Sequence, residues 1–427
     1  MSGKTYYIID FDNTFTQVEA LDELARISLT DREDRDTILT EIEQLTNLAM
    51  EGKMSFSESL ARRIRLLDAN KSHLEELIGF LKQKVSRSFA RNAAFFKRNA
   101  ADVLIVSGGF KEFIIPVVTG YHILPENIYA NTFVTTGDGK IIDYDHANPL
   151  SEEGGKVKLL RNLQLQGELL GIGDGYSDYQ LKESGVVSKF FAFTENVSRK
   201  SVTERADHVT PSFDEFLYLN NLQGTISYPK NRIICLVVGE MKDEYINMLE
   251  EDGLTVKKRK SLDTKYLKEA RLILLGKHTT ITKEEIKAAK KLRCLGITDY
   301  VQDFEELDFC SRQGVVVYAG NTKARLAERL LGYINEGIIF QSLNFQDLLQ
   351  PKTPDTHRIV LTLKNNKPSF HQVLEVFYQY PYKILSATMR TSNITSIVVV
   401  DIEKMADKSV IRQLKKLPAT IHVRTLY

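Results

Sequence analysis

The chain has 427 residues, which is enough for two or three domains with separate hydrophobic cores. Its formal net charge is only +1, so no excess of one charge points to nucleic acid or an anionic membrane surface as a partner. Hydrophobic residues make up 43% of the chain, as in ordinary globular proteins, and no apolar run approaches the roughly 18 residues that a membrane-spanning helix needs.

The N-terminus and the cysteines indicate the compartment. The first ten residues run directly into an apolar strand and contain no secretory segment. The three cysteines, Cys235, Cys294 and Cys310, lie far apart and lack the spacing of a metal or redox site. We therefore expect a cytoplasmic protein in which these thiols are buried and reduced.

The first predicted element is a buried strand, the apolar run YYII at residues 6–9, which leads directly into Asp10 and Asp12. In an extended chain, residues two apart point to the same side, so the two carboxylates would face one spot and Phe11 the opposite side. Like charges this close repel each other unless a cation or a substrate group lies between them. The structural alternative is a capping aspartate and a turn aspartate, because D-x-D-x-T alone is short enough to occur by chance.

The first half then changes from helices to an alternating pattern. Residues 17–85 repeat apolar positions at intervals of three and four, which predicts helices. From about residue 100, short apolar runs alternate with helices, which is typical of a parallel sheet flanked by helices in an α/β fold. A hairpin that turns at Asp138 and Gly139 interrupts this alternation. The pattern lapses near residue 225, where we expect a domain boundary.

The second half contains two further predicted regions. Residues 231–350 alternate strands such as RIICLVVG and ARLILLGK with helices such as TKEEIKAAKKL, which again predicts an α/β domain. The segment LLQPKTPDTH is typical of a linker. The tail, residues 356–427, shows the order strand, helix, strand, strand, helix, strand.

Polar residues follow two more predicted strands of the first half. VLIVSGGF ends in Ser107, Gly108 and Gly109 before a helix, where a hydroxyl and free backbone N–H groups can bind phosphate. LLGIGDGYSD supplies Asp174 and Asp178, and Lys156 begins a helix between the two motifs. Ligands bind at the carboxyl ends of the strands in parallel α/β sheets, so we expect these residues to converge.

The converged groups suit phosphoryl transfer. Asp10 would be the nucleophile that forms an aspartyl-phosphate, and Asp12 the acid and base that protonates the leaving oxygen and then activates water. Ser107 and Lys156 would neutralise the transferring phosphoryl group. The structural alternatives are a helix cap for Ser107 and a solvated lysine for Lys156, with Lys158 as its nearest rival. Mg²⁺ prefers carboxylate and phosphate oxygens, so the expected metal ligands are Asp10, Asp12, Asp174 and Asp178.

The ordered motifs D-x-D-x-T, S-G-G, Lys and G-D-G-x-x-D resemble the haloacid-dehalogenase superfamily and, more narrowly, the phosphoserine phosphatase family. The resemblance implies a phosphatase domain over residues 1–225, with a Rossmann-like core at 1–16 and 86–225 and a helical cap at 17–85. It implies a cap acid and base for the substrate's amino and carboxyl groups. The implied substrate-binding residues are Glu19, Met50, Phe56, Arg63, Ser107, Gly108, Gly109, Lys156 and Ser177, where Ser177 replaces the asparagine common in the family.

The second half resembles parts of another family. Residues 231–350 are similar to the first part of the substrate domain of D-3-phosphoglycerate dehydrogenase, which implies a flavodoxin-like domain. Residues 356–427 resemble that family's ACT domain, which has the strand and helix order predicted above. The dehydrogenase's nucleotide-binding domain is missing, and Gly171-x-Gly173-x-Gly175 does not meet the G-x-G-x-x-G pattern. We therefore expect neither NAD binding nor dehydrogenase activity.

These features together predict an enzyme of serine biosynthesis: a Mg²⁺-dependent phosphatase that hydrolyses L-phosphoserine to serine and phosphate. The alternatives are a phosphatase for another small phosphorylated metabolite and a regulatory or scaffold protein of serine synthesis. The dehydrogenase family acts upstream in serine synthesis, which supports phosphoserine as the substrate by analogy.

The ACT-like tail predicts self-association without strong serine binding. An exposed strand edge favours pairing with a second copy, so we expect a homo-oligomer. Lys364 stands where the family has a histidine, Ser369 replaces a glycine and Lys383 replaces an asparagine. Two lysines would repel the ammonium group of serine, so we expect serine inhibition to be weak or absent.

Overall fold

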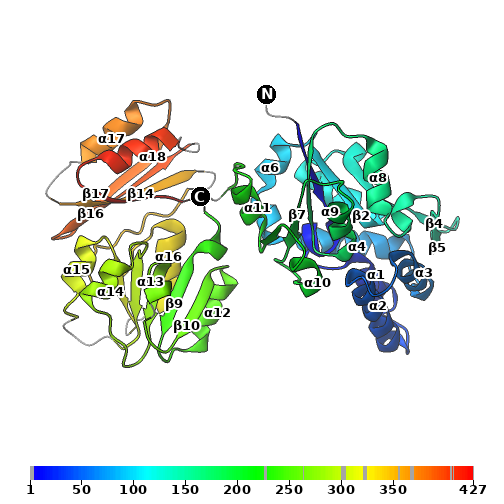
Figure 1. The fold of residues 1–427 in the computed structure, drawn as a ribbon, viewed down its shortest axis with the longest axis horizontal. Helices are drawn as coiled ribbons and strands as arrows, with labels where there is room; N and C mark the ends of the chain where they lie inside the picture. The colour runs from blue at the N-terminus through cyan, green and yellow to red at the C-terminus, as the bar shows by residue number, and fades with distance from the viewer. Residues whose placement is uncertain are drawn as a thin grey trace. The chain divides into compact units, whose positions relative to one another are not determined.

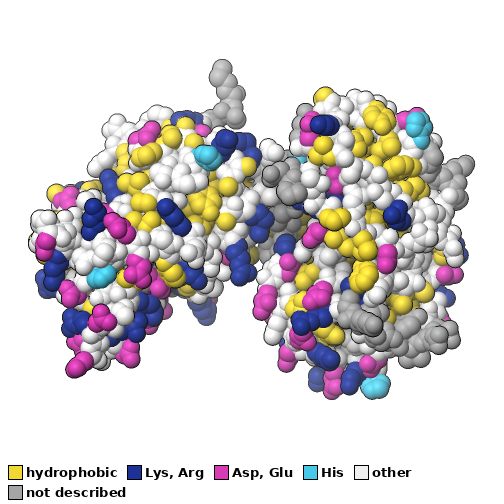
Figure 2. Space-filling view, turned by 180° about the vertical axis from the view of Figure 1, so that it is seen from behind, with side chains coloured by type: hydrophobic (Ala, Val, Ile, Leu, Met, Phe, Trp, Pro, Cys, Tyr) yellow, Lys and Arg dark blue, Asp and Glu magenta, His cyan; other side chains and the backbone are white. Residues whose placement is uncertain are grey.

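The computed structural model describes residues 4–225, 228–262, 264–299, 304–320, 325–353, 356–365, 370–403, 406 and 408–426. They form two compact units, Met1–Thr225 and Ile226–Tyr427. Each unit is described by itself (Figure 1). No helix in the described ranges combines the length and the apolar character needed to cross a membrane. On the face drawn in Figure 2, basic and acidic side chains are interspersed, in keeping with the net charge of +1.

The first unit is built on a sheet of six parallel strands in the order β3-β2-β1-β6-β7-β8. Helices cover both faces of the sheet (Figure 1), and most of the strand residues are buried. The α/β class predicted from the alternating pattern is therefore confirmed. The strands are β1 (Thr5–Ile9), β2 (Val103–Phe110), β3 (Ile128–Asn131), β6 (Glu168–Gly173), β7 (Lys189–Phe193) and β8 (His208–Thr210).

The segment at 17–85, between β1 and β2, is helical as predicted, and we call it the helical insert. It contains α1 (Ala20–Ser28), α2 (Arg35–Met50), α3 (Phe56–Leu66) and α4 (Lys71–Gln83). The predicted hairpin is also present as β4 (Phe133–Thr135) and β5 (Ile141–Tyr144), with Gly139 at φ +86° in its turn. The other helices of this unit are α5 (Arg87–Arg91), α6 (Ala93–Arg98), α7 (Lys111–Val118), α8 (Gly155–Leu163), α9 (Tyr176–Glu183), α10 (Lys200–Thr203) and α11 (Phe213–Leu219).

An aromatic core fixes the loop that follows β1. Phe11 and Phe15 are fully buried, and their rings stack with centroids 6.2 Å apart. Phe15 also meets the edge of Phe89, which packs 4.5 Å from Phe213. Burying one phenylalanine side chain stabilises a fold by about 1.5–3 kcal/mol, so these rings hold the backbone of the loop firmly. The residues between them therefore project from a rigid base.

The second unit contains a sheet of five parallel strands in the order β10-β9-β11-β12-β13. Strands β10 and β12 lie outside the predicted elements, because β10 carries the charged run Lys257–Arg259 at a sheet edge and β12 is only four residues long. The strands are β9 (Ile234–Val238), β10 (Thr255–Arg259), β11 (Ala270–Leu275), β12 (Cys294–Ile297) and β13 (Val316–Ala319), and the helices are α12 (Asp243–Glu251), α13 (Thr264–Leu267), α14 (Lys283–Ala288), α15 (Leu307–Arg312) and α16 (Leu326–Glu336). All three cysteines are buried free thiols, as expected.

The tail has the predicted order of elements: β14 (His357–Lys364), α17 (Phe370–Tyr378), β15 (Ile384–Thr391), β16 (Thr395–Ile402), α18 (Lys408–Lys416) and β17 (Thr420–Leu426). Its antiparallel sheet has the strand order β15-β16-β14-β17. Ile359 and Leu361 pack in one core with α17 and α18, while Val360, on the opposite face, packs in a core with residues of α16. Ser369, one of the residues expected to alter a serine pocket, lies outside the described residues.

Candidate active site

The two aspartates of the first motif lie in a tight turn rather than in the strand. Strand β1 ends at Ile9, and the backbone N–H of Asp10 donates to the carbonyl of Ile172 at 3.0 Å. Asp12 has φ −67° and ψ 137° inside a helical turn, and Asn13 follows at φ +52°. The Asp12 carboxylate accepts the N–H of Ala20 at 2.7 Å, at the start of α1. The prediction that a continuous strand aligns the two carboxylates is therefore wrong, although both line one cavity.

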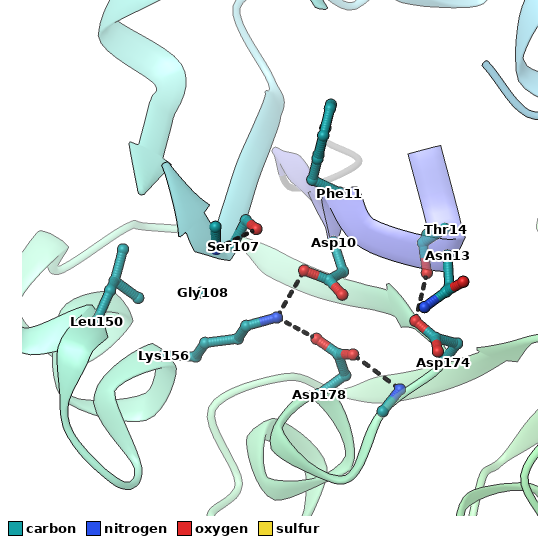
Figure 3. Close-up of polar contacts among 12 residues, drawn as sticks. Asp10, Phe11, Asn13, Thr14, Ser107, Gly108, Leu150, Lys156, Asp174 and Asp178 are labelled. Carbon is teal, nitrogen blue, oxygen red and sulfur yellow. Dashed lines mark hydrogen bonds and ion pairs between the residues drawn. The ribbon is translucent and has the colours of Figure 1, made fainter. Parts of the chain in front are cut away.

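Lys156 bridges two of the predicted carboxylates (Figure 3). Its buried ammonium lies 2.7 Å from Oδ1 of Asp10 and 2.7 Å from Oδ1 of Asp178. Burial alone would lower the pKa of Lys156, but the two carboxylates outweigh it and raise that pKa above its ordinary value. The rival lysine, Lys158, is exposed and pairs with Glu152. Of the two candidate lysines, Lys156 is therefore the one that the fold brings to the strand ends.

Three carboxylates gather around this lysine. Asp10, Asp174 and Asp178 are all buried, and each offers an oxygen within 4.8 Å of the other two. Burial raises the pKa of Asp174 to about 6, although the neighbouring guanidinium of Arg199 opposes the rise. Burial and the charge of Asp178 likewise raise the pKa of Asp10. Three crowded anions of this kind fit a hard divalent cation. Asp12, the fourth predicted ligand, does not belong to this group.

The S-G-G motif lies at the carboxyl end of a strand, and a helix follows it, as predicted. Strand β2 continues through Phe110, and α7 begins at Lys111. The hydroxyl oxygen of Ser107 accepts the N–H of Gly109 at 2.9 Å. A Cβ on Gly108 would lie 2.5 Å from the ring of Phe56, so only glycine allows this close approach.

The residues predicted from the first three motifs and from the helical insert meet in one cavity. Every predicted site residue except Asp174 and Asp178 lines it, and its volume is about 20 Å³. Met50, Phe56, Glu19 and Arg63 come from the helical insert or its entry, while the remaining residues come from the strand ends. Asp10 and Ser177, which are 167 positions apart in the chain, therefore line the same cavity.

An ion pair occupies the side of the cavity formed by the helical insert. Arg63 is buried, and its Nη1 donates to Oε1 of Glu19 at 3.2 Å and to the hydroxyl of Thr46 at 2.7 Å. Thr46 donates in turn to Asp22 at 2.8 Å. The Nε of Arg63 is buried without a hydrogen-bond partner. A fixed acid and a fixed base side by side are complementary to a ligand that carries both charges.

Burial also changes the proton affinity of Asp12, which lies beside Asp10. It raises the pKa of Asp12 to about 7, and the charge of Asp10 adds to this rise. Burial and the charge of Asp12 raise the pKa of Glu19 as well, against the opposing effect of Arg63. A carboxyl group with a pKa near neutrality can both give and accept a proton at physiological pH.

Several residues near the site lie outside the sequence prediction. Thr14 donates to Asp174 at 3.1 Å, and Asn131 donates to the carbonyl of Gly108 at 2.9 Å. Thr46 contacts Arg63, and Arg199 contacts Asp174, as described above. Only Thr14 carried a signal, because it is the threonine of D-x-D-x-T. The others act through tertiary contacts that no local spacing reveals.

Comparison with known proteins finds relatives for the first half of the chain. No family model matches. A chloroplastic phosphoserine phosphatase of Arabidopsis thaliana is 28% identical over 211 residues, which are 49% of this chain and 69% of that protein. Phosphoserine phosphatase of Homo sapiens is 25% identical over 211 residues, or 89% of its length.

Among solved structures, a phosphoserine phosphohydrolase-like protein from Francisella tularensis is 29% identical. It covers 50% of this chain and 99% of its own, with a TM-score of 0.47. The N-terminal half of the chain is thus similar in sequence to phosphoserine phosphatases of plants and animals.

Proposed function

We propose that residues 1–225 form a phosphoserine phosphatase, a phosphoric monoester hydrolase that releases serine and phosphate from L-phosphoserine. The observation that carries this proposal is that Lys156 bridges Asp10 and Asp178 in the same unit that holds the Glu19–Arg63 ion pair. The lysine with its two aspartates suits a phosphoryl group, and the Glu19–Arg63 pair suits an amino acid. The similarity to curated phosphoserine phosphatases supports the same substrate.

The reaction has two steps. A carboxylate oxygen of Asp10 attacks phosphorus, and the bond from phosphorus to the serine oxygen breaks. Asp12 gives its proton to that oxygen, which its raised pKa permits, and leaves a phosphate ester on Asp10. Asp12 then takes a proton from water as the water attacks the same phosphorus. The bond from phosphorus to the Asp10 oxygen breaks, which frees phosphate and restores the carboxylate of Asp10 and the protonated form of Asp12.

The surrounding groups hold the charge of the phosphoryl group. Lys156 lies beside Asp10 and would donate to a phosphoryl oxygen, as would the N–H of Gly108 and the hydroxyl of Ser107, whose oxygen is held by the N–H of Gly109. We propose that Asp10, Asp174 and Asp178 hold Mg²⁺, and that Asp12 acts as acid and base without binding it. When bound, the ion would neutralise negative charge on the phosphoryl oxygens.

The helical insert would act as a cap that recognises the amino acid. Glu19 would accept from the substrate ammonium, and Arg63 would donate to the carboxylate through its unpartnered Nε. Met50 and Phe56 would cover the methylene group, and Ser177 would lie at the edge of the site. A phosphate ester that lacks either charge would leave one partner of the buried pair unmatched, which is costly.

We propose that the second unit has a regulatory or structural role rather than a dehydrogenase reaction. Residues 231–350 would be a flavodoxin-like domain similar to part of the phosphoglycerate dehydrogenase substrate domain. Residues 356–427 would be an ACT-like domain that joins copies of the chain. The whole protein would act in the cytoplasm, without NAD, in serine biosynthesis.

The proposed substrate can be tested with a panel of phosphorylated metabolites. The purified protein should be assayed with Mg²⁺ against phosphoserine, phosphothreonine, glycerol phosphate and sugar phosphates. We expect kcat/KM for phosphoserine to exceed that for each other ester by about tenfold or more, and chelation to abolish all turnover. A higher kcat/KM for an ester without an amino acid group would contradict the substrate, while activity unaffected by chelation would contradict the metal.

A further inference from the structure

The catalytic cavity is too small for the proposed substrate. Its volume of about 20 Å³ holds about one water molecule, whereas an amino acid phosphate is many times larger. A second cavity of about 200 Å³ adjoins it and shares the lining residues Met50, Phe56 and Ser177. The ring of Phe56 packs against Gly108 of the strand ends. Phe56 therefore stands where the helical insert closes over the reactive groups.

A carboxylate from the core holds the backbone of Phe56. The N–H of Phe56 belongs to the first turn of α3, where a helix offers no acceptor of its own. It donates to Oε2 of Glu153 at 2.8 Å, across 97 positions of the chain. The other oxygen of Glu153 accepts from Nε2 of Gln180 at 3.0 Å, in the helix that also carries Ser177 and Asp178. Glu153 is thus fixed to the core on one side and bound to the helical insert on the other.

A second contact lies along the same boundary. Gly52, at φ +73°, lies so close to Tyr176 that a Cβ there would be 2.9 Å from the ring. Gly52 and Tyr176 both line the second cavity, as does Glu153. The helical insert and the core are therefore closely packed at Gly52, and the charged hydrogen bond from Phe56 to Glu153 crosses their boundary at an exposed position.

We propose that Glu153 is a positioning residue that holds Phe56 in the closed arrangement and so sets the balance between the closed and open site. Breaking its bond to Phe56 frees α3 to move away from the core and joins the two cavities into one space for the substrate. Glu153 touches no reacting atom in this scheme. The kinetic part of the inference rests on the proposed phosphatase function, whereas the structural part does not.

The test compares Glu153→Ala and Glu153→Gln with Glu152→Ala. Glu152 is the matched control, because it is an exposed neighbour that pairs with Lys158 and not with the helical insert. Amide hydrogen exchange at Phe56, followed by fragment-resolved mass spectrometry, should be at least about fivefold faster in Glu153→Ala and unchanged in Glu152→Ala. Glu153→Gln should be intermediate, because an amide has one acceptor oxygen where the carboxylate uses two.

The kinetic measurement separates this role from a general structural one. We expect Glu153→Ala to lower KM for phosphoserine about three- to tenfold without lowering kcat, because the open site that admits the substrate is more populated while the reacting groups are intact. Unchanged exchange at Phe56, an equal effect of Glu152→Ala, or a loss of kcat at constant KM would each overturn the inference. If phosphoserine is not the substrate, the exchange measurement still decides whether Glu153 holds the site closed.

Discussion

The ammonium of Lys156 lies 2.7 Å from Oδ1 of Asp10, although 146 positions separate the two residues in the chain. Both side chains are more than nine-tenths buried. A buried carboxylate is costly unless a cation pairs with it, and the same lysine also neutralises Asp178. This contact joins the end of β1 to the first turn of α8, and it places a fixed positive charge beside the proposed nucleophile.

Removing the positive charge of Lys156 should lower kcat strongly. In Lys156→Ala, two of the three crowded carboxylates, Asp10 and Asp178, lose their shared cation and the phosphoryl group loses a donor, so we expect kcat to fall by about a hundredfold or more. Lys158→Ala should leave kcat within about twofold, because Lys158 is exposed and bound only to Glu152. Steady-state assays of both variants check this expectation, and similar losses in the two variants would contradict the assignment of Lys156.

The Glu19–Arg63 pair should determine which ester is hydrolysed. Arg63→Ala removes the proposed carboxylate donor, so we expect kcat/KM for phosphoserine to fall about ten- to a hundredfold more than kcat/KM for a phosphate ester without a carboxylate. Arg62→Ala is the control, because Arg62 is an exposed neighbour on the same helix that pairs with Glu41. Equal losses on both esters would show that Arg63 is needed for folding rather than for recognition.

The stability of the protein should depend on pH and metal together. The folded-state pKa values of Asp12 and Asp174 are raised to about 7 and about 6, above the unfolded value of roughly 4. The folded protein therefore binds protons that the unfolded chain releases, and the stability without metal should fall as pH rises from about 4 to 7. A divalent cation at the Asp10, Asp174 and Asp178 cluster replaces the proton on Asp174, so Mg²⁺ should raise Tm by several degrees more at pH 8 than at pH 5.

The variant Asp174→Asn provides the check on this linkage. It removes one of the three clustered anions, so it should flatten the pH dependence of Tm and reduce the effect of Mg²⁺. Scanning calorimetry at both pH values with and without Mg²⁺ measures both quantities. A Tm shift by Mg²⁺ that is equal at pH 5 and pH 8 would argue against the carboxylate cluster as the binding site.

The second unit should determine the oligomeric state. Strands β15 and β17 are the two edges of the four-stranded sheet, and Leu385 and Tyr378 in this region are among the exposed large hydrophobic residues. We expect the full chain to form a homo-oligomer and the fragment 1–225 to be a folded, active monomer. Light scattering on both proteins tests this, and a monomeric full chain would refute it. Serine should inhibit the full chain weakly or not at all, which an assay with added serine measures.

Much of the fold follows from short patterns in the sequence. The apolar runs before Asp10, Ser107 and Asp174 predict strands, and the rule that parallel strands present ligands at their carboxyl ends predicts that these residues meet. The helical insert follows from its three- and four-residue apolar spacing. These predictions depend on local periodicity and on the general topology of α/β sheets, which is why they could be made from one sequence.

Other features depend on contacts that no local pattern encodes. The carboxylate of Asp12 accepts the N–H of Ala20 because the chain leaves the strand after Ile9 and turns, instead of staying extended through Asp12. Thr46 supports Arg63 from a neighbouring helix, 17 positions away. Strand β10 is not predicted because it lacks an apolar run: as an edge strand it carries Lys257 and Lys258.

The central claim is that Asp10 accepts the phosphoryl group from phosphoserine. The most direct measurement mixes the protein with phosphoserine labelled in its phosphate, stops the reaction with acid and locates the label by peptide mass spectrometry. We expect the label on the peptide that contains Asp10, and none in Asp10→Asn, which keeps the shape of the side chain but loses its nucleophilicity. Label on another residue, or steady turnover of phosphoserine by Asp10→Asn, would contradict the account.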